Sequence, residues 1–418
     1  MNKNILFISP TGTLDNGAEV SITNLMNYLV SRGHNVYNVF PNVDLMKQKE
    51  YIEFCTANNI KYFSLDILKW WWSDAPGGMP GTQGQLDVMY KKNIHEIRRI
   101  ISDNKIDLVI TNTVNMFQGA VAASCENIPH IWLIHEFPFG EFGYYREKIP
   151  FIDTFSSEVF AVSGALTKDL QDRLLNRKVK SFSPFTEITE SELIDAQDHR
   201  IVCVGRLTER KNQLELLKAY AQLENNEQKE LVFIGGWDEK YKNKCDKFIE
   251  ENQLDRVRFV GNVENPWSLL TNKDICVLPA AMETFGLVYV EAVLNNVPVI
   301  FSDNPGHLSA FQLSHAGKLY RLNNITELQE GISYLLSHFD YEKSCAIKSA
   351  EKMHEKYQIG SVYQDLVDSI ESNNIVSNQS LQSIASLFEN SNPSEMKHIS
   401  NVYYRKFLRL KNWFNRIK

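Results

Sequence analysis

The chain has 418 residues, enough for two or three domains that each bury a core of their own. Hydrophobic residues make up 43% of the sequence and charged residues 23%, with 20 Gly and 13 Pro, which excludes a collagen-like or wholly disordered chain. The six cysteines include no Cys-x-x-Cys pair, which argues against a zinc cluster and a secreted disulfide framework. We therefore expect a cytoplasmic protein.

The first apolar run, from Ile5 to Ile8, is too short for the core of a signal peptide and is better interpreted as a β-strand. No run of about 18 apolar residues follows, so no transmembrane helix is expected. The net charge of −7 is unevenly distributed. Residues 397–418 hold seven Lys or Arg and no acidic residue, so the rest of the chain carries −14.

Short apolar runs alternate with helix-length amphipathic stretches, which predicts parallel α/β sheets. We expect strands at 4–9, 36–40, 61–65, 107–111, 130–134 and 158–162, and again after Arg200 at 201–204, 231–234, 257–260, 275–278 and 297–302. The fold class is therefore α/β, with two doubly wound domains and a hinge within 181–199. Because ligands of such sheets bind at the carboxyl ends of the strands, the site is expected in a cleft between the domains.

Three consecutive tryptophans, Trp70 to Trp72, precede the Gly- and Pro-rich run 76–81. The glycines and prolines exclude a regular element, so the tryptophans are expected on an irregular loop. They either fill a gap over the core of the first domain or form an exposed platform for an acceptor sugar or lipid.

Two cations follow the strand expected at 201–204. Gly205 allows a tight turn, and Arg206 and Lys211 then lie between this strand and a helix. A guanidinium and an ammonium beside the free N–H groups of a helix start can bind a diphosphate. The alternative is two solvated surface cations.

Two glutamates follow the strand expected at 275–278. Glu283 lies in the loop after the strand, and Glu291 lies eight residues later in a helix that begins near Phe285. Gly286 at this helix start offers a second anion site, and the carboxylates can accept hydrogen bonds from hydroxyls. Alternatively, acidic residues near a helix start only complement the helix dipole. The two fragments together suit a polyhydroxylated ligand that carries a diphosphate.

These patterns resemble the retaining glycosyltransferases of family 4, which have the GT-B fold, two Rossmann-like domains facing across a cleft. The resemblance spans about residues 1 to 370. It rests on Gly205-Arg206 with Lys211, on the Glu283 to Glu291 spacing around Phe285-Gly286, and on the loop Gly17-Ala18-Glu19, with weaker support at 32–36, 134–136 and 161–163. One departure is Pro305-Gly306-His307-Leu308-Ser309, where the family often has Gly-Gly-x-x-Glu, and this departure puts a sugar contact there in doubt.

The resemblance implies roles residue by residue. Arg206 and Lys211 would bind the diphosphate of the donor, Glu283 the hydroxyls of its sugar, and Glu291 those of the ribose. The implied catalytic set is Arg206, Lys211, Glu283 and His135, which would lie against the donor sugar. The implied donor-binding set is Gly17, Gly205, Gly261, Asn262, Val263, Thr284, Phe285, Gly286, Leu287 and Glu291, and Glu19 would lie on the acceptor side.

The implied reaction transfers a sugar from a UDP- or GDP-linked donor to a glycan, favouring a lipid-linked or cell-surface polysaccharide intermediate, with retention of configuration. The chain contains no Asp-x-Asp, so neither a metal nor another cofactor is expected, and Arg206 and Lys211 would stabilise the departing diphosphate. Two alternatives stay open: a nucleotide-sugar epimerase, or a non-catalytic subunit that binds a partner enzyme. No nucleic-acid partner is expected.

At the carboxyl end, apolar residues from Ile399 to Ile417 recur every three or four positions, which predicts a basic amphipathic helix. It would hold the protein on the inner face of a membrane or pack on its own acidic body. The expected domains are an acceptor-side domain at 1–185, a nucleotide-sugar domain at 186–350, helices at 351–371 that return to the first domain, a polar linker at 372–395 and the tail at 396–418.

Overall fold

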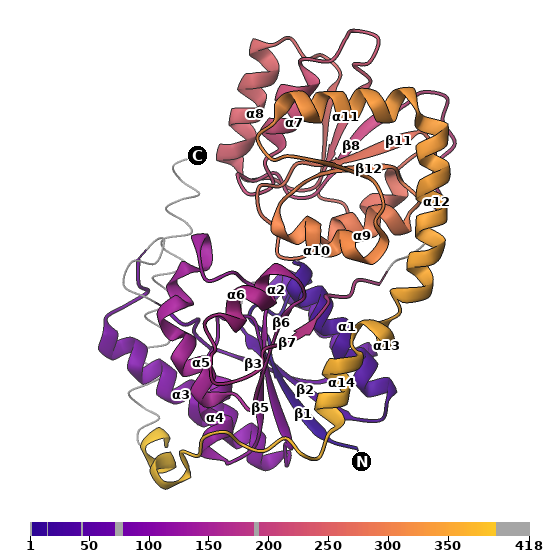
Figure 1. The fold of residues 1–418 in the computed structure, drawn as a ribbon. Coiled ribbons are helices and arrows are strands. Elements are labelled where there is room, and N and C mark those ends of the chain that lie inside the picture. Colours follow the sequence, from indigo (N-terminus) through magenta and orange to yellow (C-terminus); the bar gives the residue numbers. More distant parts are fainter. Residues whose placement is uncertain (1, 15, 43–44, 72–77, 188–191, 390–418) are drawn as a thin grey trace. The chain divides into compact units, whose positions relative to one another are not determined.

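The computed structural model describes residues 2–14, 16–42, 45–71, 78–187 and 192–389 (Figure 1). The chain folds into two compact units. Unit 1 comprises the described parts of 1–162, 166–182 and 363–389, and unit 2 comprises 163–165 and 183–362. The two units are built on the same plan, a parallel sheet covered by helices, and are described separately.

The sheet of unit 1 has seven strands in the order β3-β2-β1-β4-β5-β6-β7. All neighbouring strands are parallel. The strands are β1 (Asn4–Ile8), β2 (Asn35–Pro41), β3 (Lys61–Leu65), β4 (Leu108–Asn112), β5 (His130–Ile134), β6 (Glu158–Val162) and β7 (Lys180–Phe182). The central strands β4 and β5 are buried along their whole length, as expected when helices cover both faces of a parallel sheet.

Helices α3 and α4 cover one face of this sheet and α1 the other (Figure 1). The helical elements of unit 1 are α1 (Gly17–Ser31), α2 (Leu45–Ala57), α3 (Gln83–Asp103), α4 (Gln118–Cys125), η1 (Gly140–Lys148), α5 (Ile149–Phe155), α6 (Ala165–Gln171), α14 (Gln364–Glu371) and η3 (Gln382–Phe388). Helix α3 begins with a capping box between Thr82 and Gln85, which satisfies backbone N–H groups at its start. Helix α14 adjoins α1. The hydroxyl of Tyr363, the N-cap residue of α14, donates a hydrogen bond of 2.8 Å to the carbonyl of Ser21 in α1.

The sheet of unit 2 has six strands in the order β10-β9-β8-β11-β12-β13, again all parallel. They are β8 (Arg200–Val204), β9 (Glu230–Ile234), β10 (Val257–Gly261), β11 (Asp274–Leu278), β12 (Val299–Ser302) and β13 (Lys318–Tyr320). Since β8, β11 and β12 are adjacent, the loops that follow them leave the same edge of the sheet.

The helices of unit 2 are α7 (Gln213–Tyr220), α8 (Glu239–Glu251), η2 (Pro266–Leu269), α9 (Leu287–Leu294), α10 (Pro305–Ser314), α11 (Ile325–Ser337), α12 (Phe339–Lys356) and α13 (Ile359–Val362). A continuous apolar core joins β8, β9 and β11 to α7, α8 and α11. Its largest buried side chains include Tyr220, Tyr241 and Phe233. This core fixes the strand ends that carry the site.

The predicted α/β fold with two doubly wound sheets is confirmed. The sequence analysis missed the three-residue strands β7 and β13, which lie at sheet edges and are too short to show a hydrophobic period. Within the segment expected to be a polar linker, η3 packs Ala385 into the core of unit 1, because small and apolar residues occur there at helical spacing. No helix of the described residues has the length and apolar character needed to cross a bilayer.

Trp70 packs over the core of unit 1, which agrees with the interpretation that the tryptophans fill a gap over this core. Its ring centroid lies 5.0 Å from those of Phe117 and Phe151 and 6.5 Å from that of Trp132. Trp72 and the basic tail at 396–418 lie outside the described residues.

Gly119 in α4 tests how tightly this helix packs on the sheet. A Cβ at Gly119 would lie 2.6 Å from Ile8 Cγ1 and 3.0 Å from Thr111 Oγ1, so Gly119→Ala should destabilise the protein by about 1–3 kcal/mol despite the higher helix propensity of alanine. Gly84→Ala is the matched control, because nothing lies within 4 Å of its Cβ position in α3. Urea denaturation should show a lower midpoint for Gly119→Ala and an unchanged or higher one for Gly84→Ala; equal midpoints would contradict the close packing.

Candidate active site

The chemically active side chains of unit 2 lie on three loops that leave one edge of its sheet. Residues 205–212 follow β8, residues 279–286 follow β11, and residues 303–304 follow β12. The first loop ends at α7, the second at α9 and the third at α10, so each strand end faces a helix start. This arrangement explains why residues far apart in sequence, such as Lys211, Glu283 and His307, adjoin one cavity or ion pair.

A three-membered charge cluster joins the first two loops. Lys211 Nζ lies 2.6 Å from Glu283 Oε1, and Arg210 Nη1 lies 3.0 Å from Glu283 Oε2. Arg210 Nη1 also approaches the Met282 carbonyl at 3.2 Å. The Glu283 side chain is only 10% exposed and that of Lys211 20%, whereas that of Arg210 is 51% exposed. Glu283 therefore meets one largely buried cation and one solvated cation.

These cations keep Glu283 ionised. Burial alone would raise the pKa of its carboxyl group, but Lys211 and Arg210 outweigh burial and lower the pKa to about 2. Glu283 is therefore an anion at every physiological pH and can only accept hydrogen bonds.

Glu291 occupies a different environment on α9. Its Oε2 accepts a hydrogen bond from Trp267 Nε1 at 3.1 Å. Burial raises the pKa of Glu291, while hydrogen bonds from Trp267 and Thr186 and the charge of Lys211 oppose the shift. Lys211 thus lowers the pKa of both Glu283 and Glu291 through its charge. The roles expected for the two glutamates stay predictions.

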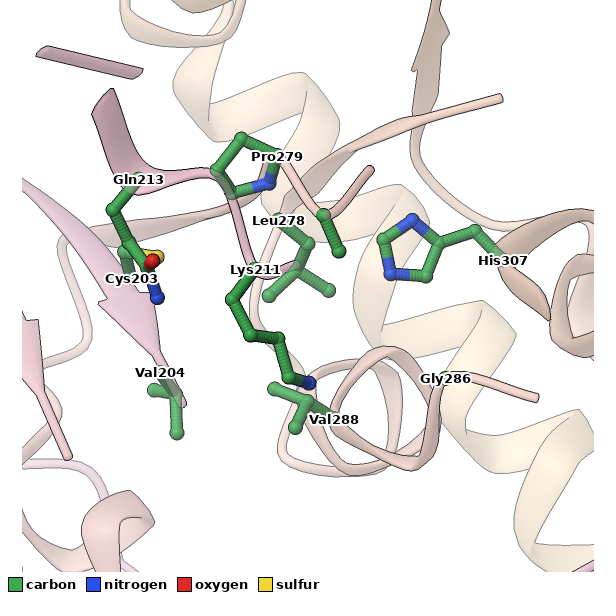
Figure 2. Close-up of a pocket in the computed structure, with 10 residues that line it drawn as sticks. Cys203, Val204, Lys211, Gln213, Leu278, Pro279, Gly286, Val288 and His307 are labelled. Atoms are coloured by element: carbon green, nitrogen blue, oxygen red, sulfur yellow. The ribbon is translucent and has the colours of Figure 1, made fainter. Parts of the chain in front are cut away.

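A small cavity of about 10 Å³ lies at the centre of this edge, with room for about one water-sized group (Figure 2). The Lys211 side chain runs through it, and the His307 ring points into it from the opposite wall. Its lining consists of Cys203, Val204, Lys211, Gln213, Leu278, Pro279, Ala280, Gly286, Val288 and His307.

Two glycines allow the loops to approach so closely. Gly286, the N-cap of α9, has φ 79°, and a Cβ there would lie 2.7 Å from His307 Cδ2. A Cβ at Gly306 would lie 2.4 Å from the carbonyl group of Glu283. Any side chain at either position would push α10 away from the Glu283 loop.

The remaining predicted residues of unit 2 lie around this cluster. Arg206 is exposed at the end of β8, and Gly205 beside it has φ 135°. Gly261, with φ 89°, ends β10 and is followed by exposed Asn262 and half-buried Val263. The residues that directly precede or begin α9 are Thr284, buried Phe285 and half-buried Leu287.

In unit 1, Gly17 opens α1, and Glu19 is fully buried in its first turn. Glu19 Oε1 accepts hydrogen bonds from Thr11 N at 2.8 Å, Thr11 Oγ1 at 2.6 Å and Gly12 N at 3.2 Å. Burial raises the pKa of Glu19 to about 7, although these hydrogen bonds oppose the shift. The carboxyl group therefore holds the loop after β1 from beneath rather than facing solvent, and its expected place on the acceptor side stays a prediction.

His135 directly follows β5 in unit 1. Asn112 donates a hydrogen bond from Nδ2 to the Ala18 carbonyl, so its Oδ1 faces His135 Nε2 at 2.8 Å and accepts a hydrogen bond from the Nε2–H group. Burial lowers the pKa of His135 to about 3, so the ring is neutral. Nδ1 of His135 then carries a lone pair and can accept a hydrogen bond.

Sequence analysis missed three residues of the site. Arg210 lies between Arg206 and Lys211, and its position as a cation next to Lys211 is the signal in the sequence that identifies it. No sequence pattern marks Trp267 as a residue of the site, because only its hydrogen bond to Glu291 places it there. His307 was recorded only as a departure from a family pattern. The described residues contain no group of three or more His, Cys, Asp or Glu side chains arranged to hold a metal ion; the metal-independent reaction stays a prediction.

The fold is that of a two-unit α/β protein with a charge cluster and a small cavity at the carboxyl ends of the strands of unit 2. A model of glycosyl transferases group 1 matches residues 184–353, and a model of glycosyltransferase family 4 matches residues 15–182. The chain belongs to the family 4 glycosyltransferases and has the GT-B fold.

Curated relatives match over part of the chain. N-acetyl-alpha-D-glucosaminyl L-malate synthase of Bacillus anthracis is 22% identical over 48% of this chain and 55% of its own length. The capsular polysaccharide biosynthesis glycosyltransferase CapH of Staphylococcus aureus is 27% identical over 36% of this chain and 44% of its own. A Campylobacter jejuni alpha-1,4-N-acetyl-D-galactosaminyltransferase, named for an undecaprenol-linked GalNAc acceptor, is 22% identical over 53% of this chain and 60% of its own. The chain thus spans about half the length of these relatives.

Solved structures match over nearly the whole fold. HepE of Anabaena, solved with UDP and glucose, has a TM-score of 0.68 at 18% identity and covers 88% of this chain and 99% of its own. TarM has a TM-score of 0.71 at 13% identity, with 89% of this chain and 99% of its own covered; it was also solved as an S. aureus variant with UDP. At these identities the likeness establishes the fold.

The ion pairs of Glu283 predict an acid-sensitive contribution to stability. Because its pKa falls from 4.5 to about 2 on folding, the contribution is full above pH 4.5 and is lost as the pH falls toward 2. Glu283→Gln should lower the free energy of unfolding by about 1–3 kcal/mol at pH 7, and the difference should stay constant down to about pH 5 and shrink as the pH falls below 4.5. Urea midpoints at several pH values measure it, with exposed Glu250→Gln as the control; a difference independent of pH would contradict the ion pairs.

Proposed function

We propose that this protein transfers a sugar from a UDP- or GDP-linked donor to a glycan acceptor, with retention of configuration and without a metal. The observation that carries the proposal is the Lys211 and Glu283 pair beside the cavity at the strand ends, with exposed Arg206 at the end of β8. A donor diphosphate needs cations, and its sugar needs a hydrogen-bond acceptor; this edge offers both.

The cations would act on the leaving group. As the bond between sugar and phosphate breaks, negative charge grows on the diphosphate, and cations fixed beforehand stabilise that charge without reorganising. Lys211 is held by Glu283 in this structure, so its position does not depend on the ligand. The exposed guanidinium of Arg206 would bind two oxygens of the diphosphate through a pair of parallel hydrogen bonds.

Glu283 is poorly suited to attack the sugar. Retention by two displacements requires a carboxylate nucleophile at the anomeric carbon. Both oxygens of Glu283 face cations, and its pKa of about 2 marks a weakly basic carboxylate. We therefore assign Glu283 to hydroxyls of the donor sugar and infer that the acceptor attacks from the face of the departing diphosphate.

The acceptor is proposed to be a lipid-linked or cell-surface polysaccharide intermediate. Two relatives support it by their names, one for capsular polysaccharide biosynthesis and one for an undecaprenol-linked glycan. The basic amphipathic pattern at 396–418 supports contact with the inner face of a membrane, where such acceptors are reached.

The decisive experiment incubates the protein with UDP-glucose, UDP-galactose, UDP-N-acetylglucosamine and GDP-mannose, with lipid-linked glycan extracts as acceptors. We expect release of one nucleoside diphosphate together with a glycosylated product of the donor's anomeric configuration, unchanged by EDTA. Interconversion of the nucleotide sugars without release would indicate an epimerase. Absence of both reactions and of nucleotide binding would indicate a non-catalytic subunit.

Removing either cation should slow transfer strongly. We expect Arg206→Ala and Lys211→Ala each to lower turnover by about 10² to 10³-fold, the scale of losing one preorganised electrostatic contact. Lys211→Arg should recover only part of the rate, because a forked guanidinium does not reproduce the position of an ammonium. Steady-state kinetics measure the effect, with exposed Lys218→Ala on α7 as the control. Near-normal rates in both alanine variants would remove the donor-site assignment.

The proposed membrane contact has a separate test. Each Lys or Arg near an anionic surface contributes about 1 kcal/mol before screening, so replacing Arg405, Lys406, Arg409 and Lys411 by Gln should largely abolish sedimentation with phosphatidylglycerol vesicles. Turnover of a water-soluble acceptor should stay nearly unchanged, since the substituted residues lie outside the donor motifs. Sedimentation of the variant equal to that of the unaltered chain would show that the tail is not the anchor.

A further inference from the structure

His307 lies at the start of α10, 2% exposed, within a network of short hydrogen bonds. Asn304, the N-cap of α10, accepts from Gly306 N and His307 N through its Oδ1, each at 3.0 Å. Its Nδ2 must therefore be the donor group, and this nitrogen lies 2.8 Å from His307 Nδ1. The orientation of the Asn304 amide is thus fixed by two backbone groups.

This contact determines the tautomer of His307. A protonated Nδ1 would place two donors 2.8 Å apart, so Nδ1 carries the lone pair and accepts from Asn304. Other contacts compete: Asn304 Nδ2 also lies 2.9 Å from the Ala280 carbonyl and 3.0 Å from Ser302 Oγ, and the Ser302 carbonyl lies 3.1 Å from Nδ1. The contact between Asn304 Nδ2 and His307 Nδ1 is the shortest of these, so we assign the lone pair to Nδ1. The proton of the neutral ring is consequently on Nε2.

The Nε2 side of the ring faces the cavity that Lys211 and Gly286 also line (Figure 2). Among the described residues, none forms a hydrogen bond with Nε2. Burial lowers the pKa of His307 to about 4, with Glu283 opposing the shift, so the ring presents a neutral N–H at physiological pH. A donor that no described residue satisfies and that opens into a cavity is placed to bind an acceptor from outside the chain.

Three kinds of donor converge on this cavity. The Lys211 ammonium enters from the β8 loop, Nε2 of His307 from α10, and the first N–H groups of α9 follow Gly286, which provides no side-chain cap. An atom with lone pairs and no proton suits such a set best, and a phosphate oxygen is one. The volume of about 10 Å³ admits one oxygen-sized group but no sugar ring.

We propose that His307 Nε2–H donates a hydrogen bond to a non-bridging oxygen of the donor's diphosphate and so helps to position it beside Lys211. The inference rests on the proposed function and adds a diphosphate-binding residue at the position where the family pattern is broken. A neutral donor orients the oxygen without adding charge, so its contribution is independent of pH across the neutral range.

The test compares two substitutions. His307→Asn keeps an acceptor near the Nδ1 position for Asn304 but has no donor at Nε2, whereas His307→Gln can place an amide N–H near Nε2. His315→Asn is the matched control: it makes the same change at the exposed end of α10, where φ is 52° and Asn is well tolerated. Calorimetry measures the affinities for UDP and GDP, and NMR titration measures those for uridine and guanosine.

We expect His307→Asn to bind the diphosphate about 10 to 100-fold more weakly with nucleoside binding unchanged, since one hydrogen bond to a charged group is lost. His307→Gln should recover part of the affinity, and the ratio between wild type and His307→Asn should be the same at pH 6 and pH 8. Diphosphate affinity of His307→Asn equal to wild type, equal losses for diphosphate and nucleoside, or a ratio that falls as the pH rises would each overturn the inference. If the wild type binds neither UDP nor GDP, the proposed function itself fails.

Discussion

The ion pair between Lys211 and Glu283 is the constraint on which the rest of the site depends. It joins the loop after β8 to the loop after β11 and does so inside a largely buried edge of the sheet, where an unpaired carboxylate would be costly. Because Glu283 holds Lys211 in place, the cation lines the cavity in a fixed position. The parallel sheet provides the geometry, since adjacent strands deliver both loops to the same edge.

That ion pair requires close packing of the backbone around it. Gly306 lies against the backbone of Glu283, and Gly286 lies against the His307 ring. A Cβ atom added at either glycine would come within 2.7 Å of these neighbours, so neither position leaves room for a side chain. These glycines bring α10 and the start of α9 against the Glu283 loop. The charge cluster and the two glycines therefore depend on one another. The glycines let the starts of α9 and α10 pack around the cavity, and Lys211 and His307 place hydrogen-bond donors at its wall.

Most of the fold and part of the site could be predicted from the sequence. The alternation of apolar runs and amphipathic helices located every strand longer than three residues. Strands buried along their length, such as β1 and β11, are mostly apolar, and the more exposed β3 and β10 still contain enough apolar residues to be recognised. The spacing after β8 and β11 located Lys211 and Glu283. Trp267 and His307 could not be assigned in this way, because their relevance arises from tertiary contacts with Glu291 and Asn304 that no local pattern encodes. Arg210 is a cation next to Lys211 in the sequence, but only the structure shows that it pairs with Glu283.

The charges of the site suggest why its histidine is neutral. Arg210 and Lys211 pair with the Glu283 carboxylate, and exposed Arg206 lies at the end of β8, so these four side chains together carry a net charge of +2. In the proposed reaction the diphosphate of the donor carries about two negative charges and gains another as it departs, so these cations would stabilise the departing group more than the bound donor. Burial keeps His307 neutral. In the proposed reaction it would therefore orient a phosphate oxygen, while Lys211 and Arg206 would supply the charge that stabilises the leaving diphosphate.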